Sequence, residues 1–251
     1  MMRLAAFADE ISPDLDEQIR VCRETGVTHF ELRSVFGKNV LDFDADLRRQ
    51  VKSKLAAAGL GVCSIGSPIG KVRIDEPFEP HWQRFKTAVE LAEFFDASLI
   101  RLFSYYPPAG GDILKHRQQV MDRFRAKVDF LAHRPITLVH ENEVKIFGEK
   151  AAQCLDLMQT IDSPKLRLAF DFANFVQAGQ RPLDHWPALR PFVAHVHVKD
   201  ALLADGKVVP AGQGDGQLEP ILIDLKERGY EGFLSLEPHL KLHGHSGGFS
   251  G

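Results

Sequence analysis

The sequence has few cysteines and no long apolar run, and both shortages exclude classes of protein. Its 251 residues include only Cys22, Cys63 and Cys154, which lie far apart and form no C-x-x-C pair. This usage predicts buried thiols in a reducing compartment, and it argues against a disulfide framework or a zinc knuckle. No apolar run approaches the roughly 18 residues of a membrane span, and the N-terminus turns acidic too soon for a signal peptide. We therefore expect a soluble, cytoplasmic protein that does not bind a membrane.

An excess of positive charge is also missing. Lys and Arg number 31 against 34 Asp and Glu, so the net charge is −3. Without a basic block, the chain is not expected to bind nucleic acid, because that affinity rests on neutralising phosphates. The segment GSPIGK (66–71) is one residue short of a phosphate loop, and GQGDG (212–216) lacks the spacing of a dinucleotide fingerprint. No G-x-S-x-G elbow of an α/β-hydrolase occurs either.

A short apolar strand, a polar loop and an amphipathic helix recur at intervals of roughly thirty residues. The strands are predicted at residues 4–8, 29–33, 61–65, 99–103, 136–141, 166–171, 193–198 and 232–237. Strict alternation of strands and helices is typical of a parallel sheet with right-handed crossovers. Eight strands in about 250 residues favour an α/β fold, a closed (β/α)8 TIM barrel that forms a single domain over residues 1–251.

The end of the chain departs from this pattern. Residues 238–251 are rich in glycine and have no apolar stripe, so the barrel is predicted to lack a C-terminal eighth helix. Leu234 and Leu236 should then face outward and leave an apolar strip beside the first strand. We expect a neighbouring subunit of a homo-oligomer, or a terminal segment folded back, to cover that strip.

Four predicted strands in succession end in a side chain that can bind a metal ion. These side chains are Glu141, Asp171, His197 and Glu237. Neighbouring strands lie about 4.8 Å apart, and barrel chemistry sits at the carboxyl ends of the strands, so we expect the four to converge on one ion. The mostly oxygen ligand set favours Mn²⁺, with Mg²⁺, Co²⁺ or Zn²⁺ as alternatives. Without an ion, the three carboxylates should repel, and at least one should take up a proton.

Other polar side chains on the inward face have simpler interpretations. His195 is predicted to be a hydrogen-bonded core residue, and Glu31 and Arg101 to form a buried structural pair. Lys199 is a candidate for stabilising oxyanion charge, and a solvated loop lysine is the alternative. Lys71 is a candidate for binding an anionic substrate, and an ordinary exposed lysine is the alternative. His239, His243 and His245 near the C-terminus are interpreted as solvated tail residues with no assigned role.

The segments HEN, DFAN, HVHVKD and LEPH occur in an order and spacing that resembles the xylose isomerase-like sugar phosphate isomerase/epimerase barrels. The opening FADEISPDLDEQI and the PAGQGDG loop are similar to members of that group as well. The resemblance implies a divalent metal held by Glu141, Asp171, His197 and Glu237, with the two glutamates exchanging a proton of the substrate. Asn174 stands where ketose epimerases of the group usually have His. It takes the place of that substrate-binding residue, and the change counts against ketose epimerisation.

The expected activity is metal-dependent isomerisation or epimerisation of a sugar or sugar phosphate. A metal that chelates a carbonyl and its neighbouring hydroxyl acidifies the C–H between them by stabilising an enediolate. Glu141 and Glu237 come from strands separated by two others, so one can remove the proton and the other return it. A dehydratase or lyase would use the same site, and a non-catalytic sugar-binding barrel would hold a structural metal. A repair endonuclease would need about three ions and more ligands than this sequence offers.

Overall fold

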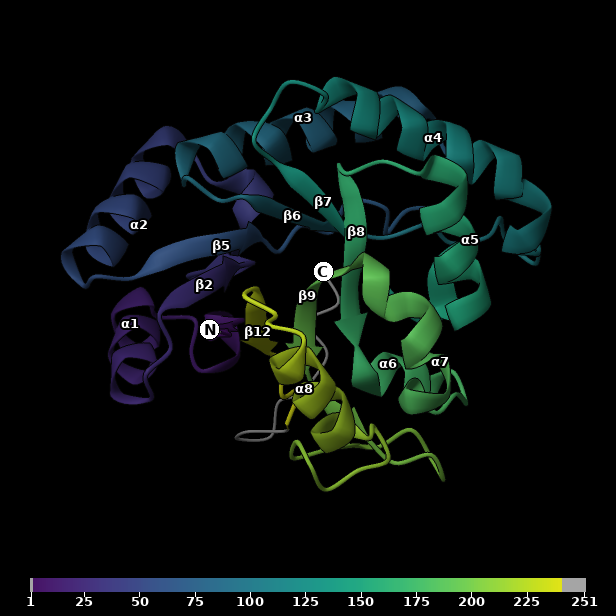
Figure 1. Cartoon of the computed structure of the whole chain (residues 1–251). Helices are drawn as coiled ribbons and strands as arrows, with labels where there is room; N and C mark the ends of the chain where they lie inside the picture. Colours follow the sequence, from purple (N-terminus) through teal and green to yellow (C-terminus); the bar gives the residue numbers. More distant parts are fainter. Residues whose placement is uncertain (1, 241–251) are drawn as a thin grey trace.

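Residues 2–240 are described by the computed structural model, and they form a closed barrel of eight parallel strands (Figure 1). The strands run around the barrel in the order β1-β12-β9-β8-β7-β6-β5-β2. Their bounds are β1 Arg3–Ala6, β2 His29–Leu32, β5 Gly61–Ile65, β6 Leu99–Leu102, β7 Thr137–Glu141, β8 Leu166–Asp171, β9 Val193–Val198 and β12 Phe233–Leu236. The prediction of a (β/α)8 barrel is confirmed.

Helices surround the strands, as Figure 1 shows. They are α1 Leu15–Glu24, α2 Ala45–Ala57, α3 Phe78–Phe94, α4 Arg117–Phe130, α5 Ala151–Ile161, α6 Phe172–Gln177, α7 Pro182–Leu189 and α8 Leu218–Glu227. Two antiparallel pairs that the sequence did not indicate extend the loops: β3 Ser34–Val35 with β4 Lys38–Asn39, and β10 Asp200–Ala201 with β11 Val208–Val209. Short 3-10 helices occupy Ala8–Glu10, Val40–Asp42, Ile113–His116, Phe147–Glu149 and Arg190–Phe192.

The helix boundaries follow local chemistry. Asp14 caps α1, because its side chain accepts a hydrogen bond from the backbone N–H of Glu17 at 3.0 Å. Gly26 follows the end of the same helix with φ of 75°, a left-handed conformation that glycine adopts without steric cost.

The barrel lumen is filled in layers of increasing polarity. Two small apolar clusters lie in the lower and middle parts of the strands, one made of Ala5, Cys63 and Phe233 and the other of Leu99, Val139 and Ala169. Above them, side chains on the same faces of the strands become polar. The polarity of the lumen therefore rises toward the carboxyl ends, where barrel enzymes carry their chemistry.

The main apolar core lies between the strands and the helices. All three cysteines are buried and free, as predicted. No helix among residues 2–240 is both long enough and apolar enough to cross a bilayer.

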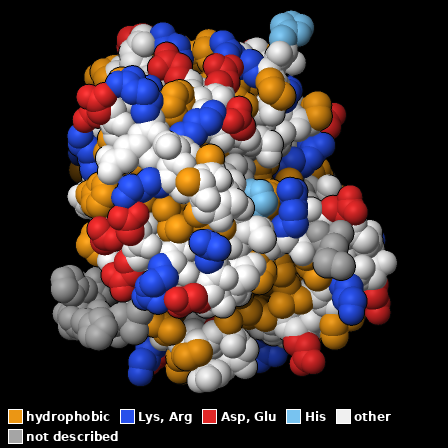
Figure 2. All heavy atoms as spheres, turned by 90° about the vertical axis from the view of Figure 1, so that its left-hand side faces the viewer, with side chains coloured by type: hydrophobic (Ala, Val, Ile, Leu, Met, Phe, Trp, Pro, Cys, Tyr) orange, Lys and Arg blue, Asp and Glu red, His pale blue; other side chains and the backbone are white. Residues whose placement is uncertain are grey.

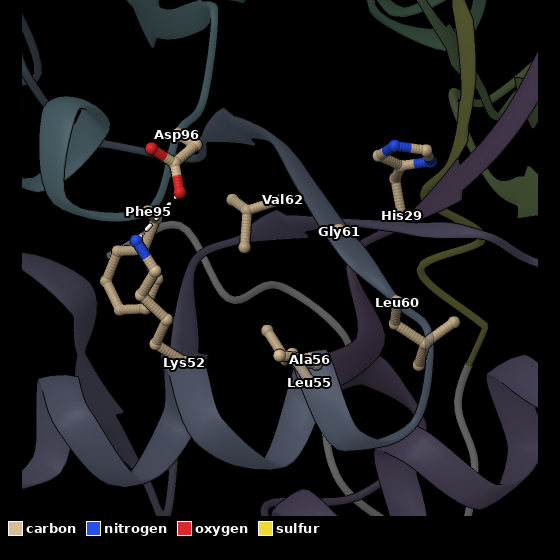
Figure 3. Close-up of a pocket in the computed structure, with 9 residues that line it drawn as sticks. All are labelled: His29, Lys52, Leu55, Ala56, Leu60, Gly61, Val62, Phe95 and Asp96. Carbon is tan, nitrogen blue, oxygen red and sulfur yellow. Dashed lines mark hydrogen bonds and ion pairs between the residues drawn. The ribbon is translucent and has the colours of Figure 1, made fainter.

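A cavity of about 230 Å³ opens at the opposite end of the barrel from the polar layer (Figure 3). His29 and Gly61, the first residues of β2 and β5, line it together with the end of α2. Lys52 and Asp96 form an ion pair at 2.7 Å along its wall. Polar residues at this end of such barrels serve stability, so we assign the cavity no chemistry.

A groove lies between α1 and α8, over strands β12 and β1. No helix follows β12 within residues 2–240, and Figure 1 shows these two strands between the two helices. Leu4 is 38% exposed and Ile223 on α8 is 48% exposed, while Leu234 and Leu236 are partly exposed, as expected. In Figure 2, which faces the side of the molecule that carries α1, hydrophobic side chains gather in the lower half. The residues of the predicted tail, 241–251, lie outside the described part of the chain.

Lys127 of α4 is a buried cation, and it leads to a prediction about stability. Its Nζ donates to the Tyr105 hydroxyl at 2.5 Å and to the Arg123 carbonyl at 3.2 Å, and it has no ion pair within residues 2–240. Burial, reinforced by the charge of Arg123, lowers the pKa of Lys127 to about 7. Above that pH the unfolded chain holds a proton that the folded chain lacks, so the free energy of unfolding should rise with pH. This contribution approaches about 1.4 kcal/mol per pH unit.

Lys127→Met should remove this contribution. Urea unfolding of both proteins between pH 7 and 8.5 would measure it as a difference that grows with pH, since the buried thiols titrate alike in both. Parallel stability curves would contradict the lowered pKa.

Candidate metal centre

The four predicted ligands converge at the carboxyl end of the barrel. Glu141 and Asp171 are the last residues of β7 and β8, His197 lies in β9, and Glu237 directly follows β12. One ligand atom from each lies within 4.8 Å of the others, and each of the four residues is at most 2% exposed. The closed barrel brings the four together because their strands are consecutive neighbours.

The arrangement of polar atoms fits a cation. His197 Nδ1 lies 3.5 Å from Glu141 Oε2, 3.5 Å from Glu237 Oε2 and 3.9 Å from Asp171 Oδ2. Neither this nitrogen nor Glu237 Oε2 makes a hydrogen bond, although both are buried. Buried polar atoms normally have partners. A divalent ion would give these atoms a partner, and three carboxylates with one imidazole suit Mn²⁺, Mg²⁺ or Co²⁺.

The buried charges of the cluster shift one another's pKa values. Burial, together with the charges of Glu141 and Glu237, raises the pKa of Asp171 to about 6 against the opposing effect of Lys199. Burial also disfavours the charge of Glu141, but His197 and Arg101 outweigh it and lower that pKa to about 2. Asp171 is therefore the carboxyl of the cluster that takes up a proton first in the absence of an ion, and it does so at about pH 6.

Two arginines flank the two glutamates. Arg101 Nη1 donates to Glu141 Oε2 at 3.1 Å, and Arg33 Nη1 donates to Glu237 Oε1 at 3.0 Å. Both guanidinium groups lie over the ring of Phe7, 4.9 and 4.4 Å from its centroid. Each guanidinium therefore fixes one glutamate at the edge of the cluster.

The predicted pair between Glu31 and Arg101 is wrong. Arg101 bonds to Glu141, and Glu31 Oε2 instead contacts His195 Nε2 at 2.6 Å and His197 Nε2 at 3.1 Å. Strand alternation correctly places both side chains in the lumen, but Glu31 meets the histidines of β9 across it. His195 is a hydrogen-bonded core residue, as predicted.

Asn174 and Lys199 lie directly against the cluster. Asn174 Nδ2 donates to Glu141 Oε1 at 3.0 Å, and its Oδ1 accepts from Lys199 Nζ at 2.9 Å. Lys199 also lies 3.2 Å from Asp171 Oδ2 and is 4% exposed, so the solvated-lysine alternative is wrong. Asn174 thereby links one ligand to a cation that neutralises another.

Lys71 is not part of the cluster. It lies at the rim, where Nζ pairs with Glu143 Oε2 at 3.3 Å and sits 4.4 Å from the centroid of the Phe103 ring. Its side chain is 11% exposed, so the alternative that Lys71 is an ordinary exposed lysine is also wrong.

The glycine-rich loop at 212–216 encloses a carboxylate of the chain itself. Asp200 accepts hydrogen bonds at 2.9 Å from the backbone N–H groups of Ala201, Gly212, Gly214 and Gly216. A Cβ at Gly214 would stand 2.4 Å from Asp200 Oδ1. The glycines therefore serve this internal contact beside Lys199, which agrees with the exclusion of a nucleotide loop.

The interpretation of His239 as a solvated residue is wrong. Its Nε2 lies 3.2 Å from Glu237 Oε1 and 3.1 Å from Glu10 Oε1, so it is no solvated tail residue. The chain turns back through Pro238, and His239 adopts a left-handed φ of 44°. Strand alternation carries no signal for a contact made beyond the end of a strand. His243 and His245 lie outside the described residues.

Comparison with known proteins gives a consistent family assignment. The family model described as xylose isomerase-like TIM barrel matches residues 19–246. A curated 3-dehydroshikimate dehydratase of Bacillus anthracis is 24% identical over 134 residues, which are 53% of this chain and 48% of that protein. The chain thus spans about half the length of that relative in the match.

Solved structures share the fold. A probable 3-DHS dehydratase, AsbF, from Bacillus anthracis has a TM-score of 0.77 at 19% identity, covering 94% of this chain and 92% of its own. The 3-keto-D-glucoside 4-epimerase YcjR from E. coli has a TM-score of 0.74 at 16% identity, covering 96% and 93%. A barrel protein from Mycobacterium smegmatis, in complex with magnesium, has a TM-score of 0.75 at 17% identity, covering 96% and 90%.

Proposed function

Since the chain belongs to the xylose isomerase-like TIM barrel family, we propose that it is a divalent-metal-dependent isomerase or epimerase of a sugar or sugar phosphate. The observation that carries the proposal is the pair of glutamates on opposite sides of His197. Oε2 of each lies 3.5 Å from the same nitrogen, at the carboxyl end of the barrel. Manganese is the proposed metal, on the chemistry of the ligand set.

Glu141, Asp171, His197 and Glu237 would hold the ion. Bound there, it would polarise a substrate carbonyl and acidify the adjacent C–H. Glu141 and Glu237 approach from β7 and β12, which β8 and β9 separate. One glutamate removes the proton from the acidified carbon, and the other returns a proton to the opposite face.

Three polar residues around the cluster have further roles in the proposed reaction. Lys199, next to Asp171 and Asn174, donates to an oxygen on which negative charge develops. Asn174 orients Glu141 and Lys199 through its amide and reaches substrate hydroxyls from the same place. Lys71 at the rim contacts an anionic part of a substrate, such as a phosphate.

A dehydratase is the second candidate. It is favoured by the match to the Bacillus anthracis 3-dehydroshikimate dehydratase, and by Asn174, which stands where ketose epimerases of the family usually have His. Such an enzyme would begin with the same proton removal and then expel a hydroxyl at the next carbon instead of returning the proton.

A substrate screen in deuterated water tests both candidates. The Mn²⁺-loaded protein would be incubated with ketoses, inososes and their phosphates, and with hydroxylated keto acids, and followed by NMR. Deuterium at a carbon next to a carbonyl supports isomerisation or epimerisation, and loss of water supports the dehydratase. Saturable sugar binding with neither outcome would favour a sugar-binding barrel with a structural metal.

We further propose that the protein forms a homodimer through the groove between α1 and α8. Hollows of about 470 and 320 Å³ lie along it, lined by apolar residues such as Leu222, Ile223 and Leu236. The exposed side of α8 carries Glu219, Ile223 and Lys226, about one helical turn apart. Neither Glu219 nor Lys226 has an ion pair within residues 2–240. An antiparallel contact between two copies of α8 would pair Glu219 of one with Lys226 of the other, around Ile223.

Ile223→Lys should convert the dimer to a monomer, because it places two like charges at the centre of the contact. Light scattering at equal protein concentrations measures the change, with Ile223→Leu as the matched control. A wild-type protein that is monomeric at every concentration would exclude the dimer.

A further inference from the structure

Glu31 occupies a position in the lumen that the proposed reaction does not use. It lies on β2, across the barrel from β9, and is 1% exposed. Its Oε2 contacts Nε2 of both histidines of β9, at 2.6 Å for His195 and 3.1 Å for His197. Its Oε1 accepts a hydrogen bond from Ser64 Oγ at 3.3 Å. One buried carboxylate thus holds two imidazoles, one of which belongs to the candidate metal centre.

The two nitrogens of His197 face different surroundings. Nε2 points to Glu31, while Nδ1 points to Glu141, Asp171 and Glu237. A carboxylate only accepts hydrogen bonds, so Nε2 must carry a proton to bond to Glu31. The lone pair of the neutral ring is then on Nδ1, which faces the three carboxylates and makes no hydrogen bond.

His195 supports the same reading of Glu31. Its Nε2 lies 2.6 Å from Glu31 Oε2 and must carry the proton for the same reason, so its buried Nδ1, which has no hydrogen-bond partner, carries the lone pair of the neutral ring. The two rings are 5.2 Å apart and nearly perpendicular, at 88°. Their Nε2–H groups can therefore reach the same oxygen from different directions without crowding each other.

We infer that Glu31 is a positioning residue for the metal centre, which fixes the ring of His197 so that Nδ1 faces the ion. The inference rests on the proposed metal site. A carboxylate behind a ligating imidazole sets its tautomer and increases its basicity, and the loss of such a partner typically lowers metal affinity 10- to 100-fold. His195 shares Oε2 of Glu31 with His197, whereas Ser64 reaches only Oε1, through a hydrogen bond of 3.3 Å.

Metal titration of Glu31→Gln tests the inference. The amide keeps the size of the side chain but removes the charge and one acceptor oxygen. Calorimetric titration with Mn²⁺ should show affinity about 10- to 100-fold weaker than wild type. Ser64→Ala is the matched control, because Ser64 contacts only Oε1, and its Mn²⁺ affinity should stay within about threefold. Equal affinity of Glu31→Gln and wild type, or an equal loss in Ser64→Ala, would overturn the inference.

The tautomer of His197 provides a second readout that general damage to the lumen would not mimic. Long-range ¹H–¹⁵N NMR spectra of wild type should show a proton on Nε2 of both His195 and His197, with and without Zn²⁺. A His197 ring that carries its only proton on Nδ1 would overturn the inference, even if Glu31→Gln fails to fold.

If wild type keeps both Nε2 protons but binds no Mn²⁺ or Zn²⁺, the proposed metal function fails and the role of Glu31 in metal binding fails with it. If wild type binds metal and only Glu31→Gln is unaffected, the proposed function stands and the inference alone fails.

Discussion

The Glu237→Gln variant is expected to lose proton exchange with solvent by a factor of about 10²–10⁴, which is the usual contribution of a positioned acid or base. The amide matches the carboxylate in size but cannot take up or return a proton. The Glu141→Gln variant should show a loss of the same order. Both losses would be measured as the rate of deuterium incorporation at saturating substrate and saturating Mn²⁺.

Asp171→Asn is the control for metal binding in this experiment. All three residues are proposed ligands, so each substitution should weaken the metal. Asp171 has no proposed proton-transfer role, and excess Mn²⁺ should restore much of the activity of Asp171→Asn but not of Glu237→Gln. Equal recovery of all three variants in excess metal would limit the glutamates to metal binding.

Removal of the metal should destabilise the folded protein as well as stop turnover. The cluster places three carboxylates within 4.8 Å of one another at no more than 2% exposure, and their repulsion is relieved by a divalent ion. At a free Mn²⁺ concentration about 100 times the dissociation constant, binding stabilises the fold by about 2.7 kcal/mol. Thermal unfolding with and without EDTA measures this difference.

The metal affinity should also increase with pH. Burial and the neighbouring carboxylates raise the pKa of Asp171 to about 6 in the metal-free cluster, so protons compete with the ion at and below that pH. Titrations at pH 5 and pH 7 should show tighter binding at pH 7. An unfolding temperature that EDTA leaves unchanged would contradict a metal centre at this place. An Mn²⁺ affinity that is equal at pH 5 and pH 7 would contradict the competition between protons and the ion.

The barrel and the convergence of the four side chains could be predicted because strand alternation and strand order determine them. Glu141, Asp171, His197 and Glu237 each mark a strand end, and consecutive parallel strands of a barrel are neighbours. The same rule places Glu31 and Arg101 in the lumen. It does not say which residue each meets across the lumen, because that depends on the stagger of the strands, and their predicted pairing was wrong.

Contacts made beyond the strands could not be predicted. His239 reaches Glu237 and Glu10 only because the chain turns at Pro238 into a left-handed conformation. Lys127 carries a charge on helix α4, yet it packs against Tyr105 in the core. In both places, tertiary packing determines the environment of a polar side chain, and the local sequence pattern does not record it.

The most direct test of the account is the location of deuterium after turnover in deuterated water, compared between wild type and the Glu141→Gln, Glu237→Gln double variant. For a substrate found in the screen, the account predicts that wild type places solvent deuterium at the carbon next to the carbonyl, and that the double variant places none. Full exchange by the double variant, or product formed by wild type without solvent deuterium, would contradict proton transfer by the two glutamates.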